Sequence, residues 1–231
     1  MSKQLFVSAI IAGAGLGKRM GGKVRKPLLT IEGRPILIYT LRNLVRVPAI
    51  REIILVVNRQ DLQLVQKELG QDLTSLRVSD VIPGGSHRFD SVKLGLQHVN
   101  PRADLVLIHD AVRPFVPLDL LQKVIARANS TGAAILATPV IDTVKRGSQG
   151  RITGTIDRAS LWLAQTPQVF RREIIQAAYD CRRPARTSDD AQLVERTGRR
   201  VAIVPGSPRN FKITTPEDLE LARAIFAPHF V

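Results

Sequence analysis

The residues with the clearest chemical potential form a glycine-rich, basic loop near the start of the 231-residue chain. Its sequence is Ala12-Gly13-Ala14-Gly15-Leu16-Gly17-Lys18-Arg19-Met20-Gly21-Gly22, and further cations follow at Lys23, Arg25 and Lys26. Glycines allow a backbone to approach phosphate oxygens, and clustered cations repel one another unless an anion neutralises them. A nucleoside triphosphate would supply that charge. The alternative is a solvated basic loop beside a tight turn.

Two familiar phosphate-binding patterns do not fit this loop. The dinucleotide pattern G-x-G-x-x-G requires glycine where Lys18 stands. The P-loop requires four residues between its glycines and Ser or Thr after its lysine, whereas Gly13 and Gly17 enclose three residues and Arg19 follows Lys18. A reductase of the dinucleotide-binding type is therefore disfavoured.

Further candidates follow the predicted strands, because functional residues of a parallel sheet gather at the strands' carboxyl ends. Gly84 and Gly85 come after an expected strand near Val78–Ile82, and Ser91 of the same loop could reach a base or sugar. The plainer alternative is an ordinary turn in which Asp90 or Ser91 caps the next helix.

A second set of candidates lies further along the chain. Asp110 and Arg113 follow the most apolar strand; an acid there could organise Mg²⁺ and substrate phosphates, and Arg113 could hold an anionic acceptor. Asp110 could instead bond only the backbone of the next turn. Lys212 lies between Phe211 and Ile213, as an inward-reaching cation would, although a strand lysine can equally face solvent.

The elements that must position these residues alternate between strand and helix. Apolar runs without polar interruption are typical of strands covered on both faces, as in parallel sheets, and apolar residues at helical spacing fall between them. We expect an α/β fold with a mostly parallel sheet. The expected strands are Leu5–Ala12, Leu28–Ile31, Glu52–Val57, Val78–Ile82, Asp104–Ile108, Ala133–Ala137 and Arg200–Val204. The expected helices are 35–45, Asp61–Leu69 with Gly70 as its end, Ser91–Val99, Leu118–Ser130, Arg171–Cys181, Asp189–Thr197 and Pro216–Phe226.

One stretch interrupts the alternation. Pro139–Ile156 contains two short β-like pieces, Thr143–Lys145 and Arg151–Ile156, around glycines, which predicts an extended hairpin that leaves the domain. A hairpin with so little core is most simply covered by a second subunit. We expect one domain over residues 1–231, with a dimerisation arm at about 139–160.

The composition limits the classes of partner. The net charge of +14 favours polyanions or phosphorylated small molecules, unless it only reflects an arginine-rich solvated surface. Aromatic residues make up 4% of the chain, which argues against a single-strand nucleic-acid binder, and no basic recognition helix is evident. No apolar run reaches the ~18 residues of a membrane span, and no signal-peptide cleavage site is present. The single cysteine, Cys181, fits a reducing cytoplasm, and four scattered histidines lack zinc-ligand spacing.

Taken in order, these segments resemble one family, the 2-C-methyl-D-erythritol 4-phosphate cytidylyltransferases of the non-mevalonate isoprenoid pathway. The resemblance covers nearly the whole chain. It departs from the family at Ala12-Gly13, where Pro-Ala is common, and at Ser188, where Thr is usual. The matching pieces are Ala14–Met20, Lys26, Gly84-Gly85, Arg88, Asp90-Ser91, His109–Pro114, Asp142–Arg146, Asp157-Arg158, Leu161-Trp162, Gln165–Gln168, Ser188–Ala191 and Asn210–Thr214.

The resemblance implies a three-layer, Rossmann-like nucleotidyltransferase fold and a reaction of CTP with methylerythritol phosphate, with Mg²⁺ bridging the triphosphate. It implies a homodimer whose hairpin reaches the partner's site, and a single activity in a chain that closes at Val231. By analogy, the catalytic residues would be Arg19, Lys26, Arg158 and Lys212; the nucleotide would contact Ala14, Gly15, Gly17, Lys18, Gly84, Gly85 and Ser91; the acceptor would contact Asp110, Arg113, Thr143 and Lys145. Asp110 is also the candidate metal ligand. A cytidylyltransferase for ribitol or another pentitol 5-phosphate is the alternative, which the Asp157-Arg158 and Leu161-Trp162 segment disfavours.

Overall fold

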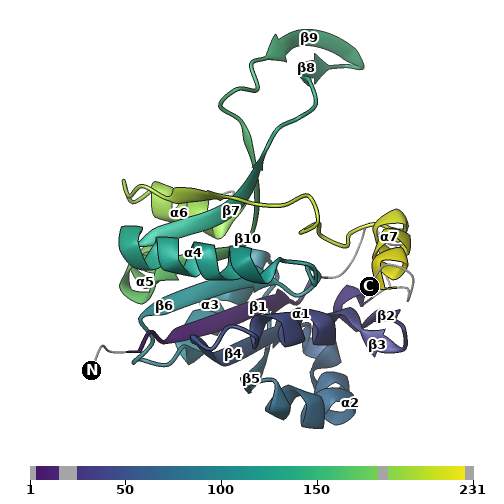
Figure 1. Ribbon diagram of the computed structural model, residues 1–231, viewed down its shortest axis with the longest axis vertical. Helices are drawn as coiled ribbons and strands as arrows, with labels where there is room; N and C mark the ends of the chain where they lie inside the picture. Colours follow the sequence, from purple (N-terminus) through teal and green to yellow (C-terminus); the bar gives the residue numbers. More distant parts are fainter. Residues whose placement is uncertain (1–3, 16–24, 182–186, 227–231) are drawn as a thin grey trace.

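The computed structural model describes residues 4–15, 25–181 and 187–226. Its centre is a seven-stranded sheet in the order β11-β7-β10-β6-β1-β4-β5 (Figure 1). Every strand runs in the same direction except β10, which is antiparallel to both of its neighbours. The mostly parallel α/β sheet is therefore confirmed. The strands are β1 (Val7–Gly13), β4 (Ile50–Val57), β5 (Val78–Pro83), β6 (Leu105–Asp110), β7 (Ala133–Pro139), β10 (Trp162–Arg171) and β11 (Ala202–Pro205).

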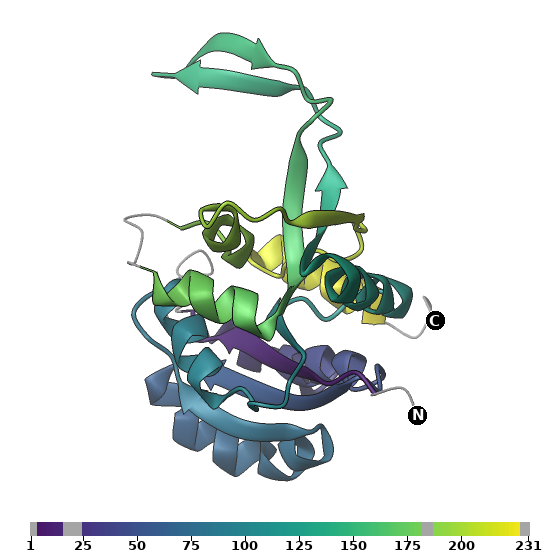
Figure 2. The ribbon, with the colours of Figure 1, turned by 90° about the vertical axis from the view of Figure 1, so that its left-hand side faces the viewer.

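Helices cover both faces of the sheet, because successive strand residues point to opposite sides. In β1, Ile11 packs into one apolar core and Ile10 into another. The result is a three-layer α/β/α arrangement (Figures 1 and 2). The first core contains side chains of α1 (Ile36–Leu44), α2 (Leu62–Ser75) and α4 (Leu118–Thr131); the second contains those of α3 (Arg88–His98), α5 (Arg172–Asp180) and α6 (Asp190–Glu195).

Sequence reasoning missed β10, which lies in the middle of the sheet. Gln165, Thr166 and Gln168 of this strand are buried, so the strand lacks the apolar run that marks its neighbours. Pro167 lies within it, and the pairing with β7 is interrupted between Ala164 and Gln168. Proline normally argues against a central strand, so the sequence of this segment gives no strand signal.

Three expected boundaries were wrong. Gly70 does not end its helix, because α2 continues to Ser75 and buries Leu73 on the same face as Leu69. Helix α3 begins at Arg88 rather than Ser91, since His87 is its N-cap and donates its backbone N–H to Asp90. The expected strand at 28–31 is shorter: a 3₁₀ turn, η2 (Lys26–Leu28), precedes β2 (Thr30–Ile31), which pairs with β3 (Arg34–Pro35).

The last helix, α7 (Pro216–Phe226), closes the carboxyl side of the sheet next to α1 and β2. A third apolar cluster joins it to the body through Ile31, Ile36, Val112 and Ile213. Phe115 stacks on Phe211 with ring centroids 5.1 Å apart. This packing brings the segment before α7, which includes Lys212 and Thr214, beside the ends of β1 and β6.

The hairpin predicted at 139–156 is confirmed as a separate two-stranded sheet that projects from the body (Figures 1 and 2). Strands β8 (Val144–Ser148) and β9 (Arg151–Ile156) are joined by Gln149 and Gly150, whose φ angles are 50° and 74°. Two positive φ angles in a two-residue loop are what a tight hairpin turn requires. We call residues 139–160 the arm.

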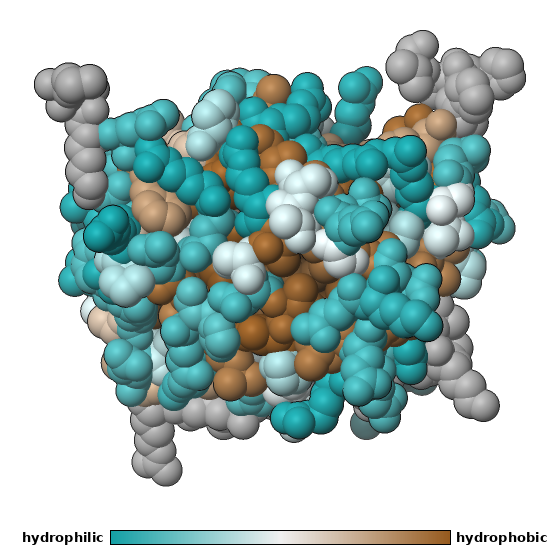
Figure 3. Space-filling view, turned by 90° about the horizontal axis from the view of Figure 1, so that it is seen from below, coloured by the Kyte–Doolittle hydropathy of each residue, from teal (hydrophilic) through white to brown (hydrophobic). Residues whose placement is uncertain are grey.

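The opposite end of the molecule is formed around β5, the other edge of the sheet. Viewed from below, this side shows apolar side chains gathered near its centre and hydrophilic ones around them (Figure 3). Leu64 of α2 and Leu94 of α3 are among the exposed large apolar residues. The charged candidates Lys26, Asp110 and Lys212 lie instead at the carboxyl edge of the sheet.

Candidate active site

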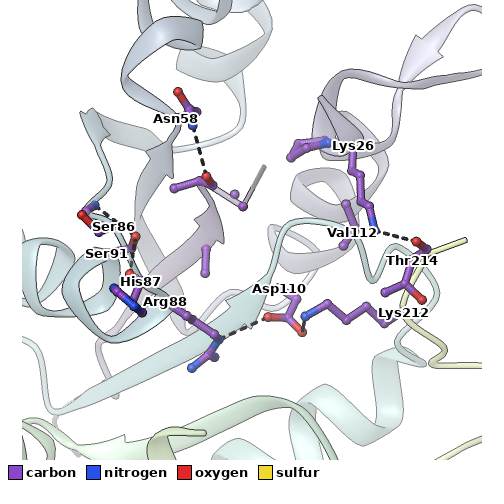
Figure 4. Close-up of a pocket in the computed structure, with 16 residues that line it drawn as sticks. Lys26, Asn58, Ser86, His87, Arg88, Ser91, Asp110, Val112, Lys212 and Thr214 are labelled. Atoms are coloured by element: carbon purple, nitrogen blue, oxygen red, sulfur yellow. Dashed lines mark hydrogen bonds and ion pairs between the residues drawn. The ribbon is translucent and has the colours of Figure 1, made fainter. Parts of the chain in front are cut away.

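A cavity of about 550 Å³ lies where β1, β4, β5 and β6 end (Figure 4). The carboxyl edge of an open α/β sheet is the usual place for a ligand. The cavity walls combine glycine backbone, small side chains and cations. The lining residues are Ala12, Gly13, Ala14, Gly15, Lys26, Pro27, Asn58, Gly85, Ser86, His87, Arg88, Ser91, Asp110, Val112, Lys212 and Thr214.

One side of the cavity is the loop between β5 and α3. A Cβ atom added to Gly84 would lie 2.4 Å from the Ala14 Cβ, and one added to Gly85 would lie 2.4 Å from the Asp90 Cβ. The Ser91 hydroxyl accepts a hydrogen bond from the Gly85 N–H at 3.2 Å and donates one to the His87 carbonyl at 3.1 Å. The two glycines are therefore required by close packing, and Ser91 holds the loop in shape.

Lys26 approaches the cavity from the other side. It is buried, and its Nζ donates to the Thr214 carbonyl at 2.6 Å. Thr214 is itself fixed by Asp218 of α7, whose Oδ2 accepts from the Thr214 N–H and hydroxyl, both at 2.7 Å. Because a buried ammonium loses hydration, this carbonyl gives it both a partner and a direction.

Asp110 is the centre of the charged wall. Its Oδ2 is 2.9 Å from Lys212 Nζ and 3.2 Å from Arg113 Nε, and its Oδ1 is 3.5 Å from Arg88 Nε. Figure 4 shows Asp110 lying between Arg88 and Lys212. Arg88 also pairs with Asp190 at 2.7 Å, so three cations face two carboxylates; the remaining positive charge favours a polyanionic ligand.

The ionisation of Asp110 follows from these neighbours. Burial would raise the pKa of this carboxyl group, but Lys212, Arg88 and Arg113 outweigh burial and hold the pKa well below its ordinary range. The group is therefore an anion at neutral pH. It orders the surrounding cations and does not act as an acid.

A buried hydrogen-bond network supports the Asp110 loop from behind. The Asp110 N–H donates to Thr166 Oγ1 at 3.1 Å, and Thr166 Oγ1 is 3.0 Å from His109 Nδ1. His109 Nε2 is 3.0 Å from the Arg113 carbonyl, which can only accept, so Nε2 carries the proton and Nδ1 accepts from Thr166. The buried polar residues of β10 thus fix the loop that carries Asp110.

Some of the expected site residues come together and others do not. Ala14, Gly15, Gly85, Ser91, Lys26, Asp110 and Lys212 line one cavity. Arg113 lies behind it, where its Nη1 donates to the Asn210 carbonyl at 2.7 Å. Gly17, Lys18 and Arg19 lie outside the described residues.

The expected residues of the arm are not at this cavity. Lys145 Nζ donates to Thr155 Oγ1 across the hairpin at 2.8 Å, and Arg158 donates to the Ile141 carbonyl. Thr143 is exposed. The arm projects away from the body of the chain (Figure 2), and none of these three residues lines the cavity.

Sequence reasoning assigned no role to Asn58, Thr214 or Arg88, all of which line the cavity. Asn58 directly follows β4, so the rule that pointed to the other strand ends would have found it; its side chain contacts the Ala14 carbonyl at 3.4 Å. Arg88 follows Gly84 and Gly85 in the sequence, but only the folded structure shows that its ion-pair partners are Asp110 and Asp190.

Comparison with known proteins gives a consistent picture. The family model described as IspD, 2-C-methyl-D-erythritol 4-phosphate cytidylyltransferase, matches residues 7–227. Curated proteins of that name from Syntrophus aciditrophicus and Geobacter metallireducens are 45% and 43% identical to this chain. The alignments cover 94% of the chain and of the first relative, and 95% and 97% for the second.

Solved structures agree with the sequences. The 4-diphosphocytidyl-2C-methyl-D-erythritol synthase from Anaerococcus prevotii superposes with a TM-score of 0.82 at 35% identity and 96% coverage of both chains. The 2-C-methyl-D-erythritol 4-phosphate cytidylyltransferase from Thermus thermophilus gives 0.78 at 32% identity, covering 96% of this chain and 98% of that one. On this sequence and structural similarity, the chain belongs to the 2-C-methyl-D-erythritol 4-phosphate cytidylyltransferase (IspD) family.

Proposed function

We propose that the cavity at the carboxyl edge is the site where this chain performs the reaction of its family. The chain transfers the cytidylyl group of CTP to 2-C-methyl-D-erythritol 4-phosphate, giving 4-diphosphocytidyl-2-C-methyl-D-erythritol and pyrophosphate. The observation that carries the assignment of the site is the convergence of Lys26, Lys212 and Arg88 on one glycine-walled cavity around Asp110. Both substrates are phosphate anions, so such a cavity suits them.

In the proposed arrangement, CTP lies against the backbone of Ala14, Gly15 and Gly85, with its triphosphate toward Lys26. A phosphate oxygen of the acceptor attacks the α-phosphorus of CTP as the bond to the bridging oxygen breaks, and pyrophosphate leaves with that oxygen. The acceptor phosphate is already ionised, so the protein contributes position and charge neutralisation. Lys26 and Arg19 stabilise the five-coordinate α-phosphorus that forms during the transfer. Lys212 and Arg113 lie on the side of the site that binds the acceptor.

The donor set of the cavity fits Mg²⁺ held mainly by the nucleotide. Protein-bound Mg²⁺ usually takes one or two carboxylates together with substrate phosphates. Among the described residues that line the cavity, Asp110 is the only carboxylate, and no cluster of three potential ligands occurs in the described part of the chain. Asp110 would be the protein ligand. The ion would neutralise triphosphate charge.

We further propose that the chain acts as a homodimer in which the arm completes the partner's cavity. Support comes from the arm's lack of a core and from its exposed apolar residues: Ile141 is 73% and Ile152 is 69% exposed. Thr143, Lys145 and Arg158 would then contact the acceptor bound by the other subunit. In this proposal residues 1–231 form one domain that acts in the cytoplasm. No helix in the part of the chain that the structure describes has the length and hydropathy to span a membrane.

Pyrophosphate release with Mg²⁺ tests the reaction. CTP, UTP, ATP and GTP are each paired with methylerythritol phosphate and with ribitol 5-phosphate. Release with CTP and methylerythritol phosphate alone is the expected result. Release with a different pair would contradict the substrate assignment, and no release with any pair would contradict the activity.

Mixing two inactive variants tests the arm. Lys26→Ala damages the cavity and Arg158→Ala damages the arm. If the arm serves the partner, half of the randomly reassembled dimers are hybrids with one intact site, and activity returns to about a quarter of the unmodified level. If each arm served its own cavity, the mixture would stay inactive.

A further inference from the structure

A chain of charged side chains connects the cavity to the buried Asp190 at the start of α6. Arg88 lies between two carboxylates: its Nη2 is 2.7 Å from Asp190 Oδ2, and its Nε is 3.5 Å from Asp110 Oδ1. Asp190 is fully buried, and its other oxygen accepts the Tyr179 hydroxyl at 2.6 Å. Lys212 continues the chain on the opposite oxygen of Asp110.

The two ends of this chain differ in their access to a ligand. Arg88, Asp110 and Lys212 line the cavity, whereas Asp190 and Tyr179 do not. Asp190 starts α6, where Gln168 of β10 accepts the backbone N–H groups of Asp190 and Ala191 at 3.1 and 3.0 Å. Asp190 is therefore held by elements that do not line the cavity. Any effect it has on the reaction must pass through Arg88.

We propose that Asp190 and Arg88 are positioning residues. Asp190 fixes the orientation of the Arg88 guanidinium, and Arg88 in turn fixes the orientation of the Asp110 carboxylate. Asp110 then holds the Lys212 ammonium in the position where it contacts the acceptor phosphate. The inference rests on the proposed function, because it assigns Lys212 to the acceptor side. Arg88 also opens α3, directly after the loop of Gly84 and Gly85. One side chain thus links the wall that faces the nucleotide to the wall that faces the acceptor.

The chemistry of the side chains explains why arginine stands at position 88. A guanidinium presents several N–H groups in a fixed plane and can bridge two carboxylates at once, whereas an ammonium acts as a single point charge. Removing the Asp190 charge would leave Arg88 with Asp110 as its remaining carboxylate, and the guanidinium would be free to turn toward it. Asp110 would then lose its set orientation toward Lys212.

The test is a steady-state comparison of Asp190→Asn with the unmodified enzyme, both substrates being varied in turn. The matched control is Asp189→Asn, the neighbouring carboxylate, which bonds Gln168 and the backbone of Gln192 and belongs to no cavity wall. We expect Asp190→Asn to lower kcat/KM for methylerythritol phosphate about tenfold, as for one lost charge-assisted bond. KM for CTP should change less than about twofold, and Asp189→Asn should leave both ratios near the unmodified values.

Two further variants keep the proposal open to refutation. Arg88→Lys keeps the charge and removes the bridge, so it should reproduce the acceptor effect even if Asp190→Asn does not fold. In a Lys212→Ala background, Asp190→Asn should cause no further loss, because residues acting in series are not additive. Equal losses for CTP and acceptor would show that Arg88 acts on the nucleotide itself, and full additivity with Lys212→Ala would overturn the coupling. Absence of activity in the unmodified enzyme would refute the proposed function instead.

Discussion

The burial of His109 has a consequence for stability that can be measured without substrate. The ring is fully buried, with Asp110, Arg113 and Lys212 as its charged neighbours. Burial is the largest cause that lowers the pKa of His109 from 6.5 to about 4 in the folded chain. Between these two values the unfolded chain binds a proton that the folded chain does not. Stability from this residue is therefore complete above pH 6.5 and is lost as the pH falls toward 4.

The size of the effect follows from the difference between the two pKa values. Each unit corresponds to about 1.4 kcal/mol, so the full loss below the folded value is about 3 kcal/mol. Between about pH 7.5 and pH 5, where most carboxylates remain ionised, the loss from His109 alone is about 2 kcal/mol. A loss of that size is a large share of the stability of a typical domain.

The assay is equilibrium urea unfolding at several pH values in that window, for the unmodified chain and for His109→Asn. The variant is less stable at pH 7.5 because it loses hydrogen bonds to Thr166 and the Arg113 carbonyl. The measured quantity is the change in the free energy of unfolding with pH, which should be about 2 kcal/mol smaller in the variant. Identical pH dependence in the two proteins would refute the assignment of a neutral, buried His109.

Three other perturbations follow from the site. Lys26→Ala should lower kcat by roughly 10²–10³ in the pyrophosphate assay, with an unchanged circular dichroism spectrum, as for one lost preorganised charge; an unchanged kcat would remove Lys26 from the mechanism. Gly84→Ala should cost about 1–3 kcal/mol in urea unfolding, because its Cβ would lie 2.7 Å from Ser91 Oγ. Gly70→Ala, with no heavy atom of the described residues within 4 Å of the added Cβ beyond its chain neighbours and the backbone of its own helix, should stabilise the chain by about 0.5–1 kcal/mol, and a loss there would contradict an unstrained helix position. Arg158→Ala should reduce kcat/KM for the acceptor more than it changes the Kd of CTP; the reverse order would place the arm at the nucleotide.

The parts of the fold that the sequence predicted are those governed by apolar pattern. Strands such as β1 and β6 bury consecutive apolar residues, so their runs are visible in the sequence. Strand β10 is the opposite case, because Gln165, Thr166 and Gln168 are buried for the hydrogen bonds they make to other elements. A polar residue that is buried to hold a distant loop resembles an exposed one in the sequence.

The candidate site also contains residues that the sequence predicted and contacts that it did not. Lys26, Asp110 and Lys212 stand out because of their local context at strand ends or between apolar neighbours, and the fold brings them to one cavity. The pairing of Arg88 with Asp190 has no local signature, since the two residues belong to α3 and α6, which are far apart in the sequence. Thr143, Lys145 and Arg158 lie away from the cavity of their own chain, so a role for them at a site depends on the proposed dimer.

The contact between Lys26 and Thr214 also orders events during synthesis of the chain. The two residues are 188 positions apart, so at about 5–20 residues per second the ribosome reaches Thr214 some ten to forty seconds after Lys26. Throughout that interval the lysine lacks the carbonyl that directs it, although most strands of the sheet have already been made. If Lys26 acts as proposed, the cavity gains its directed lysine only after Thr214 has been made, so unfinished chains should not consume nucleotide.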